Sequence, residues 1–264
     1  MIGFIGLGNM ADAMIGGILK ANRASKSDVV GSAKTAATCE RMTQKHGIAT
    51  YIDNCEVAKQ SDILFLAVKP IFLADVLVQI KDVLKPDVLI VSIAAGKSIS
   101  FYKEQLAGVS CKVVRCMPNT PALVLEGCTA VCAEDSVTKE ELSRVMDLLQ
   151  SFGVAREIPE RLMDAFVGVS GSSPAYVFMF IEAMADAAVL AGIPRNDAYT
   201  FAAQAVYGSA KMVLETGIHP AQLKDMVCSP GGTTIEAVKV LEQEGMRSAV
   251  MDAMAACIEK SKSL

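Results

Sequence analysis

The segment Gly6-Leu7-Gly8-Asn9-Met10-Ala11 has the residue types and spacing of a turn that binds the phosphates of a dinucleotide. It lies between a predicted strand over residues 2–5 and a predicted helix over residues 10–20, the order that the G-x-G-x-x-G/A pattern requires. The first glycine permits a tight turn, and the second lets the backbone approach a pyrophosphate. The helix N-terminus supplies N–H groups and partial positive charge. The sequence therefore predicts a dinucleotide-binding βαβ unit over residues 1 to about 35.

The end of the second predicted strand, over residues 29–31, bears on which dinucleotide is bound. A site that prefers NAD carries Asp or Glu there, where it binds the ribose hydroxyls. The segment Gly31-Ser32-Ala33-Lys34-Thr35 contains no acid, and Ser32 and Lys34 are able to hold a 2′-phosphate instead. This pattern favours NADPH, and use of NADH stays open. The alternative is that Lys34 is an ordinary solvated loop residue.

Three further segments follow predicted strands directly. They are Ala67-Val68-Lys69-Pro70, Ile93-Ala94-Ala95 and Met117-Pro118-Asn119-Thr120-Pro121. Open α/β sheets bind their ligands at the carboxyl ends of the strands, so these segments are candidate parts of the same site. The alternative for each is an ordinary exit from strand to loop.

A loop rich in glycine and hydroxyl groups, Ser229-Pro230-Gly231-Gly232-Thr233-Thr234, precedes a predicted helix. Its backbone N–H groups are suited to hold an anion such as a carboxylate. Thr233 and Thr234 are also suited to cap the helix, and the two roles are compatible. The loop is a candidate substrate site.

The elements that must position these segments fall into two parts. In the first part, apolar runs predict strands over 2–5, 29–31, 63–68, 88–93, 112–117 and 129–132, and helices over 10–20, 36–46, 72–84 and 139–152. Strands of this kind between helices predict a mostly parallel sheet. Beyond residue 160 only helical periodicity is found, over 162–169, 175–191, 195–215, 220–227 and 234–260. We expect a Rossmann-type α/β domain over residues 1–158, followed by an all-α domain for dimerisation and substrate binding over residues 159–264.

Composition excludes several classes of protein. A net charge of −4 on 264 residues argues against nucleic acid or an anionic membrane surface as a partner. The eight cysteines form no Cys-x-x-Cys pair and lie far from both histidines, so no metal site is expected. Free thiols in this number indicate a reducing compartment, and no run reads as a convincing membrane span. We expect a cytoplasmic protein.

The helical part is unusually apolar. The segment Ala183–Ala191 is apolar almost all round, and such a helix must be buried on several sides. About a hundred residues can hardly bury it alone. The sequence therefore predicts an obligate homodimer at least.

Taken together, these motifs resemble the pyrroline-5-carboxylate reductase family over essentially the whole chain. The match includes the glycine turn, Phe65–Pro70, Arg115–Pro121, Gly171–Tyr176 and the loop Ser229–Ile235, which is the family signature. The resemblance implies a cofactor site at Ile5, Gly6, Leu7, Gly8, Asn9, Met10, Asn54, Ala67, Val68, Lys69, Pro70, Ile93, Ala94 and Ala95. It implies substrate binding by Glu160, Ser229, Gly232, Thr233 and Thr234, and an interlocked helical dimer with larger rings of dimers in some members.

The implied reaction is hydride transfer from NADPH to the C=N carbon of 1-pyrroline-5-carboxylate, giving L-proline, with Thr234 as the candidate that hydrogen-bonds and helps protonate the ring nitrogen. A β-hydroxyacid dehydrogenase is the nearest alternative. Such enzymes need a lysine on a helix of the second domain, and Asp164–Glu182 contains none. An imine reductase of other specificity and a non-catalytic NADPH-binding regulator also stay open.

Overall fold

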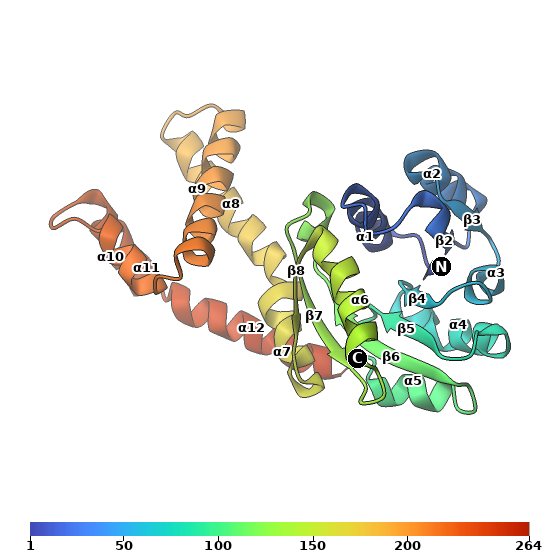
Figure 1. Cartoon of the computed structure of the whole chain (residues 1–264). Helices are drawn as coiled ribbons and strands as arrows, with labels where there is room; N and C mark the ends of the chain where they lie inside the picture. Colours follow the sequence, from blue (N-terminus) through green and yellow to red (C-terminus); the bar gives the residue numbers. More distant parts are fainter. Residues whose placement is uncertain (264) are drawn as a thin grey trace. The chain divides into compact units, whose positions relative to one another are not determined.

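The computed structural model describes residues 1–263, and within them one sheet of eight strands forms the first part of the chain (Figure 1). Its strands are β1 (Ile2–Ile5), β2 (Val29–Ser32), β3 (Ala49–Tyr51), β4 (Ile63–Leu66), β5 (Val88–Ser92), β6 (Cys111–Met117), β7 (Gly127–Ala133) and β8 (Gly153–Glu157). Their order across the sheet is β3-β2-β1-β4-β5-β6-β7-β8. Strands β1 to β6 pair in parallel, β7 is antiparallel to β6, and β8 is parallel to β7. The expected mostly parallel sheet is confirmed.

Helices cover both faces of this sheet (Figure 1). One face packs against α1 (Asn9–Lys20), α2 (Ala36–His46) and α6 (Lys139–Leu149), and the other against α3 (Asn54–Ala58), α4 (Leu73–Ile80) and α5 (Ile99–Gln105). Successive strand residues point to opposite faces, so Phe4 enters one core and Ile5 the other. Phe4 stacks on Phe65 of the next strand with ring centroids 4.7 Å apart. Burial on both faces explains why these strands are apolar throughout.

Short polar signals set the ends of the helices. Thr35 accepts a hydrogen bond from the Thr38 N–H at the start of α2, and Gly47 ends that helix with φ +72°. Thr138 and Glu141 form a capping box at the start of α6. The bounds of α2 agree with those expected, whereas α6 begins at the expected residue and ends earlier, at Leu149, because Gln150–Phe152 forms a 3₁₀ helix.

Two strands of the sheet, β3 and β8, and two helices that pack on it, α3 and α5, were not predicted from the sequence pattern. β3 and β8 are edge strands of three and five residues, and most of their side chains are not buried. These strands are therefore too short and too exposed for an alternation of apolar and polar residues to be detected in the sequence. Five short 3₁₀ helices also surround the sheet: Lys26–Asp28, Pro70–Phe72, Lys81–Val83, Thr120–Val124 and Gln150–Phe152.

The rest of the chain is helical. It begins with a 3₁₀ turn over Glu160–Leu162, α7 (Met163–Phe166) and a π-helical turn over Val167–Gly171, and continues with α8 (Ser173–Leu190), α9 (Arg195–Thr216), α10 (Pro220–Val227), α11 (Thr233–Gln243) and α12 (Met246–Lys262). The single helix expected over residues 234–260 is wrong. Gly245, with φ +72°, breaks it into α11 and α12, because a left-handed residue cannot continue an α-helix.

Two compact units can be distinguished. The first comprises residues 1–172 together with the end of α12 from Cys257 onward, and the second comprises residues 173–256. The end of α12 is held in the first unit by Ser261, whose hydroxyl donates to Asp164 at 2.7 Å. The sheet itself ends at Glu157, next to the expected domain boundary after residue 158.

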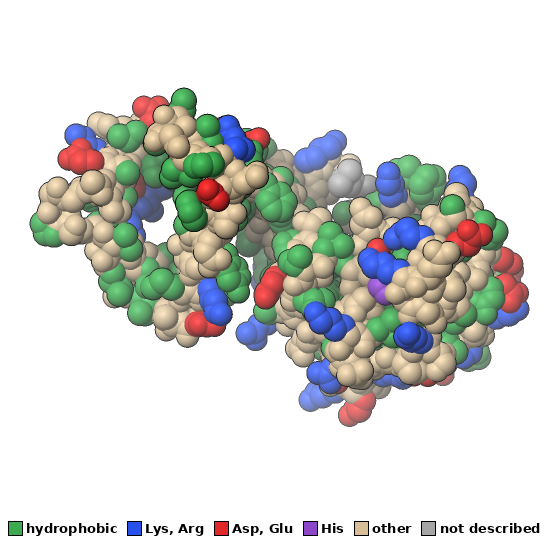
Figure 2. Space-filling model, turned by 90° about the horizontal axis from the view of Figure 1, so that it is seen from above, with side chains coloured by type: hydrophobic (Ala, Val, Ile, Leu, Met, Phe, Trp, Pro, Cys, Tyr) green, Lys and Arg blue, Asp and Glu red, His purple; other side chains and the backbone are tan. Residues whose placement is uncertain are grey.

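The helices of the second unit expose many large apolar side chains, and Figure 2 shows apolar groups gathered over them. Phe178 and Met179 on α8 are 62% and 68% exposed. The helical run from Glu160 to Leu190 is long and apolar enough to cross a membrane by length and composition, and 6% of its most apolar window is buried. Apolar surface of this extent marks a contact with another surface.

Candidate functional site

The glycine turn has a shape that only glycine permits at its first position. Gly6 has φ +94°, and a Cβ there would lie 2.7 Å from the Ala67 carbonyl oxygen. The Gly6 N–H donates to the Ser32 carbonyl at 2.9 Å. The turn thus lies against the ends of both β2 and β4, which brings together three of the predicted cofactor segments.

Gly8 leaves the start of α1 open. It is the N-cap of that helix, with φ −78°, and no side chain caps the helix there. No atom lies within 4 Å of the position that a Cβ on Gly8 would occupy. The start of α1 is therefore open beside Gly8 and has no side-chain cap, which leaves room for an anionic phosphate group at the helix N-terminus.

A cavity of about 410 Å³ continues from the turn. It is lined by Gly6, Ser32, Ala33, Lys34, Ile52, Asn54, Val68, Phe72, Asp75, Val76 and Gln79. Within it the buried Ser32 hydroxyl donates to Asn54 Oδ1 at 2.8 Å, and Asn54 Nδ2 donates to Gln79 Oε1 at 2.8 Å. Lys34 is exposed at the rim. The turn, the open helix end and this cavity together fit a dinucleotide.

Five of the cavity residues lie outside the cofactor segments predicted from the sequence: Ile52, Phe72, Asp75, Val76 and Gln79. Ile52 follows β3, which was not predicted, and Gln79 lies on α4 with no motif around it. Phe72 follows Pro70 by two residues, and Pro70 begins a short 3₁₀ helix. The run Lys69-Pro70-Ile71-Phe72 was thus a usable signal, because proline fixes the direction of the chain there.

A buried hydrogen-bonded pair of side chains, Ser92 and Tyr102, fixes the backbone at the end of β5. The Tyr102 hydroxyl is hydrogen-bonded to Ser92 Oγ, which accepts from the Ala94 N–H at 3.2 Å. Burial raises the pKa of Tyr102 to about 12, so this phenol stays protonated. The pair holds Ala94, a predicted cofactor residue, in one orientation.

Glu160, a predicted substrate residue, lies in the first unit and makes two hydrogen bonds there. Its Oε1 accepts hydrogen bonds from the Ile99 N–H at 2.7 Å and from Arg115 Nη1 at 3.3 Å. Arg115 is 6% exposed, and its Nε has no hydrogen-bond partner within the described residues. Glu160 therefore ties the start of α5 to β6 and neutralises a buried cation.

Asn119, at the centre of the Pro-Asn-Thr-Pro segment, also holds structure together. Its amide nitrogen donates to the carbonyl and hydroxyl of Ser170 at 3.1 and 3.0 Å, and its oxygen accepts from the Cys128 N–H at 2.8 Å. The segment thus joins β7 to the π-helical turn, and an ordinary structural role accounts for it.

The loop before α11 belongs to the second unit. Gly231 has φ +67°, and Gly232, the N-cap of α11, donates its N–H to the Ser229 carbonyl at 3.0 Å. A Cβ on Gly232 would lie 2.5 Å from Ser229 Oγ, so the Ser229 hydroxyl lies over the start of the helix. Thr233 and Thr234 are in the first turn of α11, and no side chain caps the helix. The capping role considered for the two threonines is therefore wrong.

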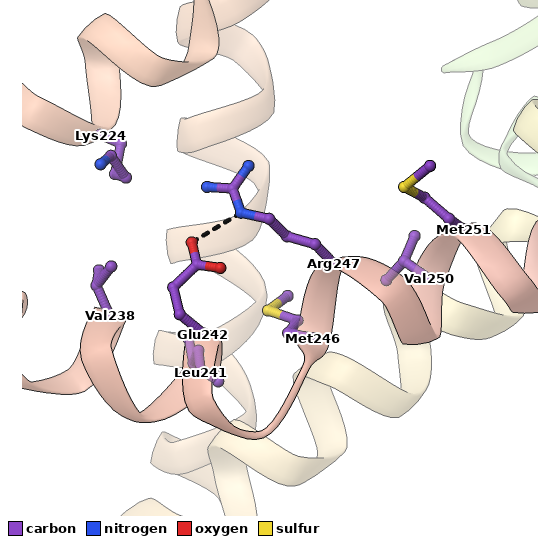
Figure 3. A pocket seen from close by; sticks show the side chains of 8 residues that line it. All are labelled: Lys224, Val238, Leu241, Glu242, Met246, Arg247, Val250 and Met251. Carbon is purple, nitrogen blue, oxygen red and sulfur yellow. Dashed lines mark hydrogen bonds and ion pairs between the residues drawn. The ribbon is translucent and has the colours of Figure 1, made fainter.

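A separate cavity of about 540 Å³ lies at the turn between α11 and α12 in the second unit (Figure 3). Five apolar residues line it together with the charged Lys224, Glu242 and Arg247: Val238, Leu241, Met246, Val250 and Met251. Arg247 Nε donates to Glu242 Oε1 at 2.7 Å. None of the candidate site residues contributes to this cavity.

The parallel sheet, the glycine turn and the open start of α1 define the first unit as the nucleotide-binding part of an NAD(P)-dependent oxidoreductase. Residues 1–96 match a family model described as NADP oxidoreductase, coenzyme F420-dependent, and residues 160–264 match one described as pyrroline-5-carboxylate reductase dimerisation. The pyrroline-5-carboxylate reductase of Escherichia coli K12 is 52% identical over 263 residues, which cover 100% of this chain and 97% of that protein.

Two solved structures are similar over nearly their whole length. That of a pyrroline-5-carboxylate reductase from Coxiella burnetii has a TM-score of 0.91 at 32% identity, covering 99% of this chain and 97% of that one. That of the Plasmodium falciparum pyrroline carboxylate reductase, with NADP bound, has a TM-score of 0.88 at 36% identity, with coverage of 99% and 97%. The chain belongs to the pyrroline-5-carboxylate reductase family.

Proposed function

We propose that this protein reduces 1-pyrroline-5-carboxylate to L-proline, the last step of proline biosynthesis, with NADPH as the hydride donor. Membership of the family supports the reaction, and the open face of Gly8 at the start of α1 is the structural observation that carries the cofactor site. When bound, the dinucleotide supplies the hydride. The protein supplies binding, orientation and exclusion of water.

The cofactor is held by residues at the carboxyl ends of β1, β2, β4 and β5. The turn Ile5, Gly6, Leu7, Gly8, Asn9 and Met10 presents backbone N–H groups to the phosphates. Ser32 and Lys34 lie at the rim of the adjoining cavity, which suits the 2′-phosphate of NADPH. Asn54 is set by its bonds to Ser32 and Gln79. The segments Ala67–Pro70 and Ile93–Ala95 complete the wall.

The substrate carboxylate is held at the start of α11. An anion is stabilised at a helix N-terminus by free N–H groups and the helix dipole, and the Ser229 hydroxyl lies over that end. Thr233 provides a backbone N–H group, and Gly232, whose own N–H donates to the Ser229 carbonyl, lets the carboxylate approach the backbone closely. Thr234 hydrogen-bonds the ring nitrogen and relays a proton to it. In the first unit, the predicted substrate residue Glu160 contributes by fixing the segment before α5.

The functional unit is a homodimer built from the helical domain, for which we retain the bounds 159–264. The family model over residues 160–264 names a dimerisation domain, and the exposed apolar side chains of α8 and the cavity beside α12 (Figure 3) suit burial against a second copy. Association into a ring of dimers is compatible with this unit. The eight cysteines are all free, which supports a cytoplasmic location.

Oxidation of NADPH followed by absorbance tests the function. We expect turnover with 1-pyrroline-5-carboxylate, less with piperideine-carboxylate and none with β-hydroxyacids run in reverse with NADP⁺. The same assays with NADH measure the cofactor preference. Tight NADPH binding without turnover of any imine would overturn the proposal in favour of a regulator.

A further inference from the structure

A cluster of charged groups centred on one buried carboxylate lies behind the glycine turn. Asp12, in the first turn of α1, is 8% exposed. Its carboxylate accepts from Arg41 Nη1 at 3.0 Å and Lys45 Nζ at 2.8 Å, and lies 2.6 Å from His46 Nε2. The three partners are all on the second half of α2. The cluster therefore fastens the start of α1 to α2.

Arg41 makes one contact that its neighbours do not make. Its second terminal nitrogen, Nη2, donates to the Leu7 carbonyl oxygen at 3.2 Å. Leu7 is the residue between the two glycines of the turn, and its side chain is 2% exposed. The planar guanidinium group thus spans the helix and the turn with two parallel donors, which a lysine cannot do.

The orientation of the Leu7 carbonyl determines where the next N–H points. A trans peptide is planar, so the Leu7 C=O and the Gly8 N–H point in opposite directions, and the described residues contain no cis bond. The carbonyl points toward Arg41, and the Gly8 N–H donates to no backbone carbonyl of residues 1–263. Space for a Cβ on Gly8 is open.

We propose that Arg41 is a positioning residue for cofactor binding, which holds the Leu7–Gly8 peptide so that the Gly8 N–H is presented to the pyrophosphate. The inference rests on the proposed placement of the phosphates at the glycine turn. Arg41 acts through the backbone and does not contact the dinucleotide. It therefore affects NADPH and NADH equally, because both carry the pyrophosphate and only NADPH carries the 2′-phosphate.

Lys45 provides a matched control, because among the described residues its hydrogen bonds go to the same carboxylate and the side-chain bond to the Leu7 carbonyl comes from Arg41. The dissociation constants of NADPH and NADH are measured by titration of cofactor fluorescence for wild type, Arg41→Met, Arg41→Lys and Lys45→Met. We expect Arg41→Met to weaken both cofactors by about tenfold, as for one lost hydrogen bond. Arg41→Lys should recover part of the loss, and Lys45→Met should stay within about twofold of wild type.

Steady-state kinetics and thermal unfolding separate positioning from general damage. For Arg41→Met we expect KM for the cofactor to rise while kcat and KM for the imine stay within about twofold, with an unfolding temperature close to that of Lys45→Met. A loss confined to NADPH would mean that Arg41 binds the 2′-phosphate, and an equal loss in Lys45→Met would mean that the whole cluster matters. Either result, or wild-type binding by Arg41→Met, overturns the inference.

The proposed cofactor site itself is tested in the same titrations by Gly8→Ala. Wild-type affinity in Gly8→Ala would show that the phosphates do not bind at the glycine turn, and would so contradict the proposed cofactor site. Weak binding by Gly8→Ala beside normal binding by Arg41→Met would contradict the role of Arg41 alone.

Discussion

Glu160 Oε1 lies 3.3 Å from Arg115 Nη1, and the arginine side chain that it neutralises is almost completely buried. The two residues are 45 positions apart in the chain. Loss of a carboxylate from such a pair leaves a buried cation without its partner. Glu160 is therefore important for folding as well as being a candidate for substrate binding.

Glu160→Ala should lower the free energy of unfolding by about 2 to 4 kcal/mol. Glu160→Gln, which can still accept both hydrogen bonds, should lose less. Urea unfolding followed by circular dichroism measures the change, and Glu157→Ala, at an exposed position of β8, is the control. If Glu160→Ala were as stable as the control, the pair would have no structural role.

Substitution of the two glycines of the turn should have different effects on stability and on cofactor binding. Gly6→Ala forces a side chain into the left-handed region and against the Ala67 carbonyl, so we expect a loss of about 2 kcal/mol or more in stability. The added methyl group of Gly8→Ala has open space around it, so the free energy of unfolding should fall by less than about 1 kcal/mol. The affinity for NADPH should fall by about tenfold or more, which corresponds to about 1.4 kcal/mol of binding free energy. Unfolding and binding titrations on the two variants measure both effects. A severe folding defect in Gly8→Ala would contradict the open space found beside Gly8.

Lys34 is predicted to determine preference for NADPH. Lys34→Ala removes a cation from the rim of the cavity, and we expect KM for NADPH to rise by about tenfold with little change for NADH. Lys20→Ala, which removes an exposed lysine at the other end of α1, serves as the control for net charge. Equal changes with both cofactors would show that Lys34 does not recognise the 2′-phosphate.

Thr234→Ala should lower kcat/KM for the imine by about a hundredfold, within the range for loss of a proton-transfer group, and leave NADPH affinity unchanged. Thr234→Ser retains the hydroxyl and should recover most of the activity. Stopped-flow measurement of NADPH oxidation gives the rate of the chemical step. Normal turnover in Thr234→Ala would remove this residue from the mechanism.

Asp12 should contribute to acid stability. Burial raises the pKa of this carboxyl, but hydrogen bonds from Lys45, His46 and Arg41 outweigh it, and the pKa lies below its usual value. A carboxylate with a lowered folded pKa stabilises the protein above its unfolded pKa, and this stabilisation is lost as the pH falls through the folded value.

At pH 7, Asp12→Asn should therefore be less stable than wild type by about 1 to 2 kcal/mol. The difference should shrink below about pH 4, the ordinary pKa of aspartate. Thermal unfolding from pH 7 to pH 3 follows this convergence. A difference that stayed constant with pH would show that Asp12 acts by packing alone.

Much of the fold follows from local pattern. The bounds of β1, α2 and α10 agree with those expected from the sequence, because each has a strong apolar period or a clear capping residue. The edge strands β3 and β8 were missed, since they are short and mostly unburied. The break at Gly245 was missed because apolar periodicity continues on both sides of it, although the glycine was a usable signal.

The sequence by itself determined the glycine turn and the loop Ser229–Thr234, because both depend on residue types within one short segment. Only the tertiary structure decided that Arg41 holds Leu7, that Ser32 holds Asn54 and that Glu160 neutralises Arg115. These partners are 34, 22 and 45 residues apart. The position of a polar side chain in the sequence does not indicate its hydrogen-bond partner. The partner is determined when packing of the sheet and helices brings the two groups within hydrogen-bond distance.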